Sequence, residues 1–226
     1  MSLLKAVPAP VSTDTVLFFS PHPDDETIAS GGYLKSATLA GAKVYIVLVT
    51  DGNKHHLEKI RYNEFATVTG YLGVPETNLT YLNYPDGSLS KMNLNEVKDK
   101  FKNLIEKVKP TIILIPSSDD RHPDHRTTGM CAERAVLELN YTTKMYYYLV
   151  HFPNFPSPMD FNKKLFLPPP LRLLDFNKEW LSFPLTEDLE NFKQNALMKY
   201  KTQLKYFLPK ELILTFIRKN ELFVAR

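Results

Sequence analysis

The sequence predicts an α/β fold of the Rossmann-like type, with a mainly parallel central sheet and helices on both faces of that sheet. Segments of strand length alternate with segments of helical periodicity from residue 16 to residue 151. The strand segments are continuous apolar runs, which are typical of strands with both sides covered. With 226 residues, the chain is predicted to form one domain, 1–226, because a chain of this length buries roughly 70% of its unfolded surface in a single core.

Five segments are predicted to be strands because each is a short, mainly apolar run, and the first three end at strand-breaking residues. The first run stops at Pro21, the second at Asp51-Gly52 and the third before the turn Pro85-Asp86-Gly87. The fourth, TIILIP, is apolar after its first residue. The predicted strands span residues 16–20, 43–50, 79–83, 111–116 and 145–151.

Four intervening segments are predicted to be helices from their apolar spacing and from the residues that end them. Gly41, Gly73 and Pro110 end the first three. The third has the clearest helical spacing of apolar residues. The predicted helices span residues 26–41, 57–72, 93–109 and 127–139.

Two later segments do not fit this alternation. Residues 153–170 contain six of the 17 prolines, with aromatic residues between them. We interpret this stretch as a rigid, irregular segment that packs on the core, with a substrate rim as the alternative. Residues 193–226 carry eight Lys or Arg against two Glu. A solvated helix face explains that excess, and a surface for an anionic substrate or membrane headgroups is the alternative.

The composition excludes several classes of protein. The chain has 28 basic and 25 acidic residues, a net charge of +3, which is too balanced to indicate a nucleic-acid partner. A single cysteine excludes a disulfide framework and a Cys-rich zinc finger. No apolar run reaches the roughly 18 residues of a membrane span, and the first residues lack the apolar core of a signal peptide. We therefore expect a cytoplasmic protein without stable membrane insertion.

Two near-identical tetrapeptides hold the residues that most often bind metals. His22-Pro23-Asp24-Asp25 follows the first predicted strand, and His122-Pro123-Asp124-His125 follows the fourth. Ligands of open parallel sheets bind beyond the carboxyl ends of the strands, so both tetrapeptides are predicted to lie in one crevice. Imidazole combined with carboxylate suits zinc best, and other divalent first-row metals are compatible with it.

The spacing of these residues predicts separate roles. His22 and Asp25 are three residues apart on a turn that opens a helix, so their side chains can point to the same side. His125 would supply a third ligand from across the crevice, and three protein ligands leave a position open for water, as in catalytic zinc sites. Asp24 would then be the general base. A zinc ion lowers the pKa of bound water to about 7, so a weak carboxylate base suffices.

Other polar residues carry weaker signals. We expect His55-His56 to be exposed to solvent, His151 to be a rim residue and not a ligand, and Cys131 to fill the core. The pair Asp119-Asp120 fits a site rim and a solvated loop equally well.

In their order along the chain, the motifs resemble the PIG-L/LmbE-like family of metal-dependent N-deacetylases. Residues 61–64 are similar to that family's Arg-x-x-Glu helix, 196–204 (ALMKYKTQL) to a later helix, and 216–223 (FIRKNELF) to its terminal segment. The resemblance thus spans nearly the whole chain. Its core motifs are Ser20 to Glu26 with Gly31-Gly32, Thr50-Asp51-Gly52, Pro85-Asp86-Gly87 and His122 to Arg126.

The resemblance implies a Rossmann-like fold and a zinc site of His22, Asp25 and His125, with Asp24 as general base. It implies hydrolysis of the N-acetyl group of an N-acetylglucosamine-containing molecule, with release of acetate. The partner is then a small amino-sugar conjugate. A homo-oligomer is compatible with the sequence.

The resemblance also implies that His122 assists catalysis and that Asp124 orients it. The segment before His122 departs from the family pattern. Some relatives carry a tyrosine there that assists the carbonyl oxygen, where this chain has Asp119, Asp120 and Arg121. The oxyanion therefore needs another donor in this chain.

The sequence indicates the residues that bind substrate less clearly than it indicates the metal ligands. Arg61, Asp86 and Arg126 are candidates for holding sugar hydroxyls or a charged aglycone, and ordinary ion pairs are the alternative for each. Two other functions stay open: another single-metal hydrolase such as a phosphoesterase, and a non-catalytic sugar-binding or metal-binding protein. Two-metal phosphatase sites need more His and carboxylate ligands than these candidate positions offer, and a binding module has no need of a base at Asp24.

Overall fold

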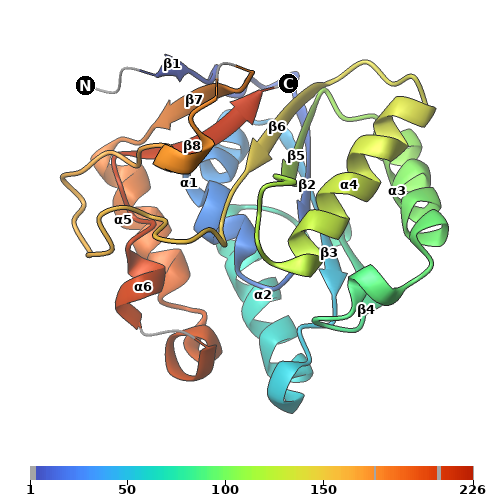
Figure 1. Cartoon of the computed structure of the whole chain (residues 1–226), viewed down its shortest axis with the longest axis horizontal. Helices are drawn as coiled ribbons and strands as arrows, with labels where there is room; N and C mark the ends of the chain where they lie inside the picture. Colours follow the sequence, from blue (N-terminus) through green and yellow to red (C-terminus); the bar gives the residue numbers. More distant parts are fainter. Residues whose placement is uncertain (1–3, 176, 208–209, 226) are drawn as a thin grey trace.

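The computed structural model describes residues 4–175, 177–207 and 210–225. One mixed sheet runs through the molecule, with its strands in the order β1-β7-β8-β6-β5-β2-β3-β4 (Figure 1). The strands are β1 (Lys5–Ala6), β2 (Thr15–Ser20), β3 (Lys43–Thr50), β4 (Leu79–Tyr84), β5 (Ile112–Pro116), β6 (Lys144–Tyr148), β7 (Glu179–Pro184) and β8 (Asn220–Ala225).

The strand directions confirm the predicted α/β fold with a mainly parallel sheet. Strands β2 to β6 pair in parallel with one another, and β1 pairs in parallel with β7. Only β8 runs against its neighbours, β6 and β7. The central strands β2 and β5 are apolar and buried, as their continuous apolar runs predict.

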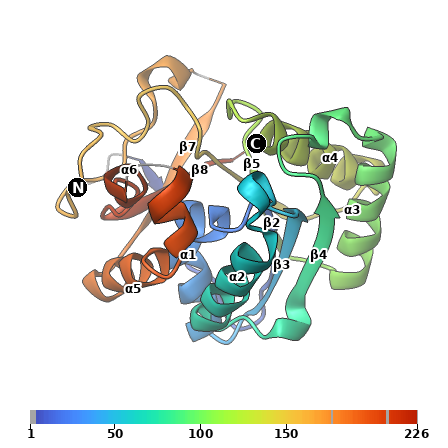
Figure 2. The ribbon, with the colours of Figure 1, turned by 90° about the horizontal axis from the view of Figure 1, so that it is seen from below.

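Helices cover both faces of the sheet. In Figure 2, α1, α2 and α5 lie on one side of the strands, and α3 and α4 lie on the other. The helices are α1 (Asp25–Leu39), α2 (Glu58–Leu72), α3 (Leu94–Val108), α4 (Pro123–Glu138), α5 (Glu187–Leu197) and α6 (Lys210–Leu214). Within the described residues, no helix combines the length and apolarity needed to span a bilayer.

Two glycines bring helices close to the sheet. A Cβ atom on Gly129 of α4 would lie 2.2 Å from the carbonyl oxygen of Pro116, so only glycine lets α4 pack against the end of β5. A Cβ on Gly32 of α1 would lie 2.4 Å from the Leu185 side chain. The backbone N–H of Gly32 donates to the Glu221 carboxylate of β8 at 2.7 Å. The contact at Gly129 thus places α4 against β5, the strand that precedes it, and the contacts at Gly32 place α1 against β8 and the end of β7.

The predicted element boundaries are wrong in two places near the crevice. Helix α4 begins at Pro123 and not at residue 127, because proline is preorganised for the first helical position. Strand β6 ends at Tyr148 and not at His151. The N–H groups of Val150 and His151 instead donate to the Asp120 carboxylate, at 3.1 and 3.0 Å, so this backbone turns away from the sheet.

Residues 153–170 contain no helix or strand, as predicted, and the structure describes all of them. The segment both packs on the core and forms a rim, because Phe155 is buried and also lines the main cavity. Buried Arg218 shapes it by donating to the carbonyl oxygens of Asn162 (2.8 Å), Pro158 (2.7 Å) and Asp160 (2.8 Å).

The basic stretch 193–226 is not simply a solvated helix face. Lys193 is buried and lies 2.8 Å from the Glu221 carboxylate, and Arg218 is fully buried. The solvated-face interpretation is therefore wrong for these two residues. Lys201 and Lys219 are exposed, as expected.

Candidate active site

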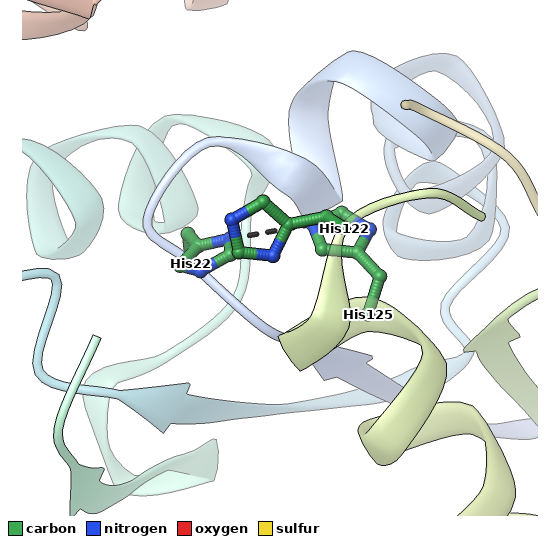
Figure 3. A group of neighbouring side chains, drawn as sticks. All are labelled: His22, His122 and His125. Carbon is green, nitrogen blue, oxygen red and sulfur yellow. Dashed lines mark hydrogen bonds between the residues drawn. The ribbon is translucent and has the colours of Figure 1, made fainter. Parts of the chain in front are cut away.

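The two His-Pro-Asp turns lie side by side at one edge of the sheet. One turn connects β2 to α1 and the other connects β5 to α4. Because β2 and β5 are neighbours that run in parallel, their carboxyl ends meet at the same edge. Figure 3 shows the result: His22 points from its loop toward His122 and His125, which come from the start of α4.

The three predicted ligands come together as a tight triangle of atoms. Nδ1 of His22 lies 3.3 Å from Oδ2 of Asp25. That same oxygen lies 3.1 Å from Nε2 of His125, and the two ring nitrogens are 3.3 Å apart. All three side chains are buried. The edges of this triangle therefore measure 3.1–3.3 Å.

This geometry fits a divalent metal. Ligand atoms about 2.0–2.1 Å from a tetrahedral zinc ion stand about 3.3–3.4 Å apart, which matches the triangle. Three other groups of described residues also bring one ligand atom each within 4.8 Å of one another. They are His22–His122–His125, Asp25–His125–His151 and His22–Asp86–Asp124.

The second nitrogen of each ring supports the same assignment. Nε2 of His22 lies 3.1 Å from Oδ2 of Asp124 and 3.3 Å from Oδ1 of Asp86. Nδ1 of His125 lies 3.1 Å from Oδ2 of Asp120, although the angle is too bent for a regular hydrogen bond. Metal-binding histidines commonly direct their other ring nitrogen at a carboxylate, which fixes the ring and its tautomer.

The carboxylates around these rings shift several pKa values. Burial alone would lower the pKa of His125, but the charges of Asp120 and Asp25 raise it to about 9. Burial alone would raise the pKa of Asp86, but the hydrogen bond and charge of His22, with the charge of Arg61, lower it to about 2. The floor of the site is thus a dense network of opposite charges.

Asp24 stands beside the triangle in a strained conformation. Its φ of 126° lies in a region that non-glycine residues rarely adopt, and such strain gathers at functional sites. Its N–H donates to Oε2 of Glu26 (3.2 Å), and Tyr200 donates to the other oxygen of that buried carboxylate (2.5 Å). Burial first, and then the charge of Asp25, raise the pKa of Asp24 well above its usual range.

Gln203 connects Asp24 to Arg61. In the amide orientation that satisfies both neighbours, the Gln203 nitrogen donates to Oδ2 of Asp24 at 3.1 Å, and its oxygen accepts from Nε of Arg61 at 2.7 Å. Gln203 also lines the main cavity. The segment after α5 therefore reaches back to the candidate base.

The structure contradicts one expectation about the second turn. The Asp124 carboxylate does not orient His122: it contacts His22 and accepts from the N–H groups of Gly87 (2.7 Å) and Leu89 (3.0 Å). His122 is instead the N-cap of α4, where its Nδ1 accepts from the backbone N–H of Asp124 at 3.3 Å. Since Asp124 lies within the first turn of α4, its side chain turns toward the loop after β4.

His22, Asp25 and Asp24 line a cavity of about 460 Å³, and His125 lies fully buried behind them. His122 and His151 also line this cavity, and burial lowers the pKa of each to about 4, helped by nearby histidine charges. One wall is apolar. It comprises Ile28, Val150, Phe152, Pro153, Phe155, Met159, Leu212, Ile213 and Phe216.

The candidate substrate-binding residues separate into two groups. Arg61 and Asp86 line the cavity and form an ion pair with each other at 3.2 Å. Arg61 also donates to the carbonyl oxygen of Gly52 at 2.9 Å, so it braces the loop after β3. Arg126 is exposed and lines a neighbouring depression and not this cavity.

Sequence analysis missed one residue at this site, Gln203, which contacts Asp24. His151 lines the cavity as expected of a rim residue, and it also offers a ligand atom near those of Asp25 and His125. Of the two alternatives for Asp120, the solvated loop is wrong, because Asp120 is buried behind His125. The position of Asp120, two residues before the second tetrapeptide, was the available signal. The contacts of Gln203 and His151 depend on tertiary structure. Cys131 is buried as expected and His56 is exposed; the His55 side chain lies outside the description.

Fold and site together define the class: an α/β protein with a His/Asp metal-type centre at the carboxyl ends of its parallel strands. The family model described as PIG-L, GlcNAc-PI de-N-acetylase, matches residues 17–136, just over half of the chain. The chain belongs to this family.

Curated relatives and a solved structure agree with this membership. The chain is 33% identical over 133 residues to the diacetylchitobiose deacetylase of Thermococcus kodakarensis, covering 54% of this chain and 48% of that protein. It is 31% identical over 134 residues to a probable N-acetyl-alpha-D-glucosaminyl L-malate deacetylase 2 of Bacillus cereus, covering 54% and 60%. The matches thus span about half the length of these relatives.

The structural likeness extends further along the chain. The N,N'-diacetylchitobiose deacetylase of Pyrococcus horikoshii, solved with an inhibitor, superposes with a TM-score of 0.71 at 23% identity. The superposition covers 94% of this chain and 84% of that one. At this identity the likeness shows the fold, including the strands outside the matched family segment.

Proposed function

We propose that this protein is a zinc-dependent N-deacetylase that hydrolyses the N-acetyl group of an N-acetylglucosamine-containing substrate and releases acetate. The observation that carries the proposal is the triangle of His22, Asp25 and His125, with the Asp24 carboxylate beside it on the floor of a cavity. The two curated relatives are named for different molecules that share an acetylated glucosamine. The sugar is therefore the element we assign to this site.

His22, Asp25 and His125 would hold the metal. When bound, a zinc ion polarises the substrate carbonyl and lowers the pKa of a water molecule to about 7. Two imidazoles with one carboxylate suit zinc better than magnesium or calcium, which prefer ligand sets made of oxygen alone.

Asp24 is the proposed general base. It takes a proton from the attacking water and returns a proton to the leaving amine, so that water and amide become acetate and free amine. A carboxylate in this role contributes roughly a hundred- to ten-thousand-fold to the rate. Its strained backbone, fixed through Glu26, keeps the side chain at the edge of the triangle.

His122 is the proposed donor to the developing oxyanion. Because its Nδ1 accepts from the Asp124 backbone, the hydrogen of the neutral ring is carried by Nε2, which can donate. His151 lines the same cavity and is a second donor. These histidines would take the role of the tyrosine that some relatives carry.

The test is acetate release by protein loaded with one equivalent of zinc. We would assay free N-acetylglucosamine, diacetylchitobiose, aryl and lipid-linked N-acetylglucosaminides and a glycopeptide, and quantify acetate and free amine together. Equal amounts of both products, lost with chelator and restored by zinc, are the expected result. No acetate from any substrate, with turnover of a phosphoester, would instead assign the site to another single-metal hydrolase.

Metal content gives an independent measurement. Protein purified without chelator or nickel resin should contain about one equivalent of zinc per chain. A content near zero, with no uptake of added zinc, would contradict the metal site irrespective of the substrate.

A further inference from the structure

A second depression, of about 280 Å³, adjoins the main cavity. Arg121 and Phe152 line both hollows, so they form the divide between them. The guanidinium carbon of Arg121 lies 5.6 Å from the centre of the Phe152 ring, within the range of a cation–π contact. A molecule seated over the triangle could therefore extend across this divide.

The lining of the second depression is strongly positive. Arg121, Arg126 and Arg172 all contribute to it. Among the described residues, no carboxylate lies within 4.0 Å of any of these three guanidinium groups. The one acidic residue in the lining, Asp119, is paired with Lys178 at 2.9 Å. Three positive charges thus face the depression without a neutralising partner.

The depression is assembled from distant segments that hydrogen bonds hold in place. The backbone N–H of Arg121 donates to the carbonyl oxygen of His151 at 2.7 Å. Arg172 lies on a short 3-10 turn, Leu171–Leu173, and Nε1 of Trp180 donates to the Leu173 carbonyl oxygen at 3.1 Å. The Asp119–Lys178 pair joins the same two regions. The backbone that carries the arginines is therefore tied down.

We propose that this depression binds an oxyanion on the aglycone of the substrate, a carboxylate or a phosphate, while the N-acetyl group lies in the main cavity. The inference rests on the proposed deacetylase function and specifies its substrate class. Guanidinium groups match both anions because their N–H donors form paired hydrogen bonds with two oxygens. Phe152 and Leu173 supply apolar surface for the carbon atoms between sugar and anion.

The main test compares a neutral substrate with two anionic ones of similar size. These are methyl N-acetylglucosaminide, N-acetylglucosamine 1-phosphate and a carboxymethyl N-acetylglucosaminide. At least one anionic substrate should have a kcat/KM about tenfold above the neutral one, because one charge-assisted contact contributes about that factor. Arg172→Ala and Arg126→Ala should each reduce this preference severalfold, mainly through KM.

The matched control is Arg134→Ala. Arg134 is an exposed arginine on the same helix as Arg126, and it lines neither hollow. This variant should keep the full preference for the anionic substrates. An equal loss in Arg134→Ala and Arg126→Ala would show a general effect of net charge and overturn the proposed subsite.

A binding experiment separates this proposal from the proposed reaction. Calorimetry on zinc-loaded Asp24→Asn should give a dissociation constant about tenfold lower for N-acetylglucosamine 1-phosphate than for the methyl glycoside. Inorganic phosphate should compete with the sugar phosphate. Turnover of the neutral substrate with no anionic preference in either assay would overturn the subsite and leave the deacetylase function standing.

The remaining outcomes also decide the matter. Anion-selective binding without acetate release from any substrate would support the subsite and contradict the reaction. Inorganic phosphate that binds without competing with the sugar phosphate would indicate a free-anion site, contrary to the proposal.

Discussion

His22-Pro23-Asp24-Asp25 and His122-Pro123-Asp124-His125 occupy the same place in two adjacent strand–helix units, yet their side chains have different tasks. In the first turn the helix begins at Asp25, and in the second it begins already at Pro123. The third residue is therefore a strained loop residue in one case, Asp24, and a helical residue in the other. A shift of two residues in the helix start turns one aspartate toward the cavity and the other toward His22.

The first positions also differ between the two turns, whereas the fourth positions agree. His22 contributes to the triangle, whereas His122 caps a helix and lies beside it. The fourth residue of each turn, Asp25 or His125, belongs to the triangle in both. The two similar tetrapeptides thus place the fourth residue in the same way. The backbone conformation of each turn decides what the first and third residues contact.

The largest expected effect comes from removing the shared fourth position. Asp25→Ala and His125→Ala should each lose zinc and, with it, nearly all acetate release, because two ligands hold the ion far less tightly than three. Elemental analysis after dialysis and an acetate assay measure both. His56→Asn is the control: it removes an exposed imidazole, and Asn tolerates the positive φ of that position. It should keep full zinc content.

The next effect separates base from ligand. Asp24→Asn should keep about one equivalent of zinc and lose roughly a hundred- to ten-thousand-fold in kcat. His122→Ala should likewise retain zinc and turn over more slowly, because it removes a donor and no ligand. If Asp24→Asn loses the metal while Asp25→Ala remains loaded, the two adjacent carboxylates have the opposite roles.

Asp124→Asn tests the role of the third residue of the second turn. Since the Asp124 carboxylate holds His22, this variant should bind zinc roughly 10- to 100-fold more weakly. Excess zinc should then restore most of its kcat. A normal zinc affinity with the reduced kcat of His122→Ala would mean that Asp124 acts through His122, as the family resemblance implies.

The smallest effects concern the helices that follow the two turns. Gly129→Ala should lower the free energy of unfolding by about 3 kcal/mol, because the new methyl group meets a backbone carbonyl. Gly32→Ala should cost only about 1 kcal/mol, since the end of the Leu185 side chain can move. Urea denaturation with chelator present measures both. Equal losses would show that α1 is packed as tightly as α4.

Much of the fold could be predicted because its central strands are locally distinct. The apolar run from Lys43 to Thr50 forms a strand with the predicted bounds. Strand β8 was not predicted, because its first residues are polar. Asn220 and Glu221 are buried there with distant partners: Asn220 bonds to the Leu167 backbone, and Glu221 pairs with Lys193 and accepts from the N–H of Gly32. Such partners lie far away in the sequence.

The candidate site, too, could be predicted only in part. The positions of His22, Asp25 and His125 follow from strand order and helical spacing, both of which can be inferred from the sequence. The partner of Asp124 could not be inferred, because it depends on where α4 begins and on how the loop after β4 approaches. Gln203 reaches Asp24 from 179 positions further along the chain, and no local pattern records that contact.

Arg218 has a consequence for how this site can diversify. It holds the rim segment through the carbonyl oxygens of Pro158, Asp160 and Asn162, groups that every amino acid possesses. The backbone between Pro158 and Asn162 is therefore held mainly through main-chain groups, and the Asp160 carboxylate adds an ion pair to Arg218 at 3.6 Å. An exposed side chain of this stretch such as Met159, which also lines the cavity, can thus be exchanged in evolution without rebuilding the loop. One buried arginine thereby lets the side chains of the rim vary while the path of its backbone stays the same.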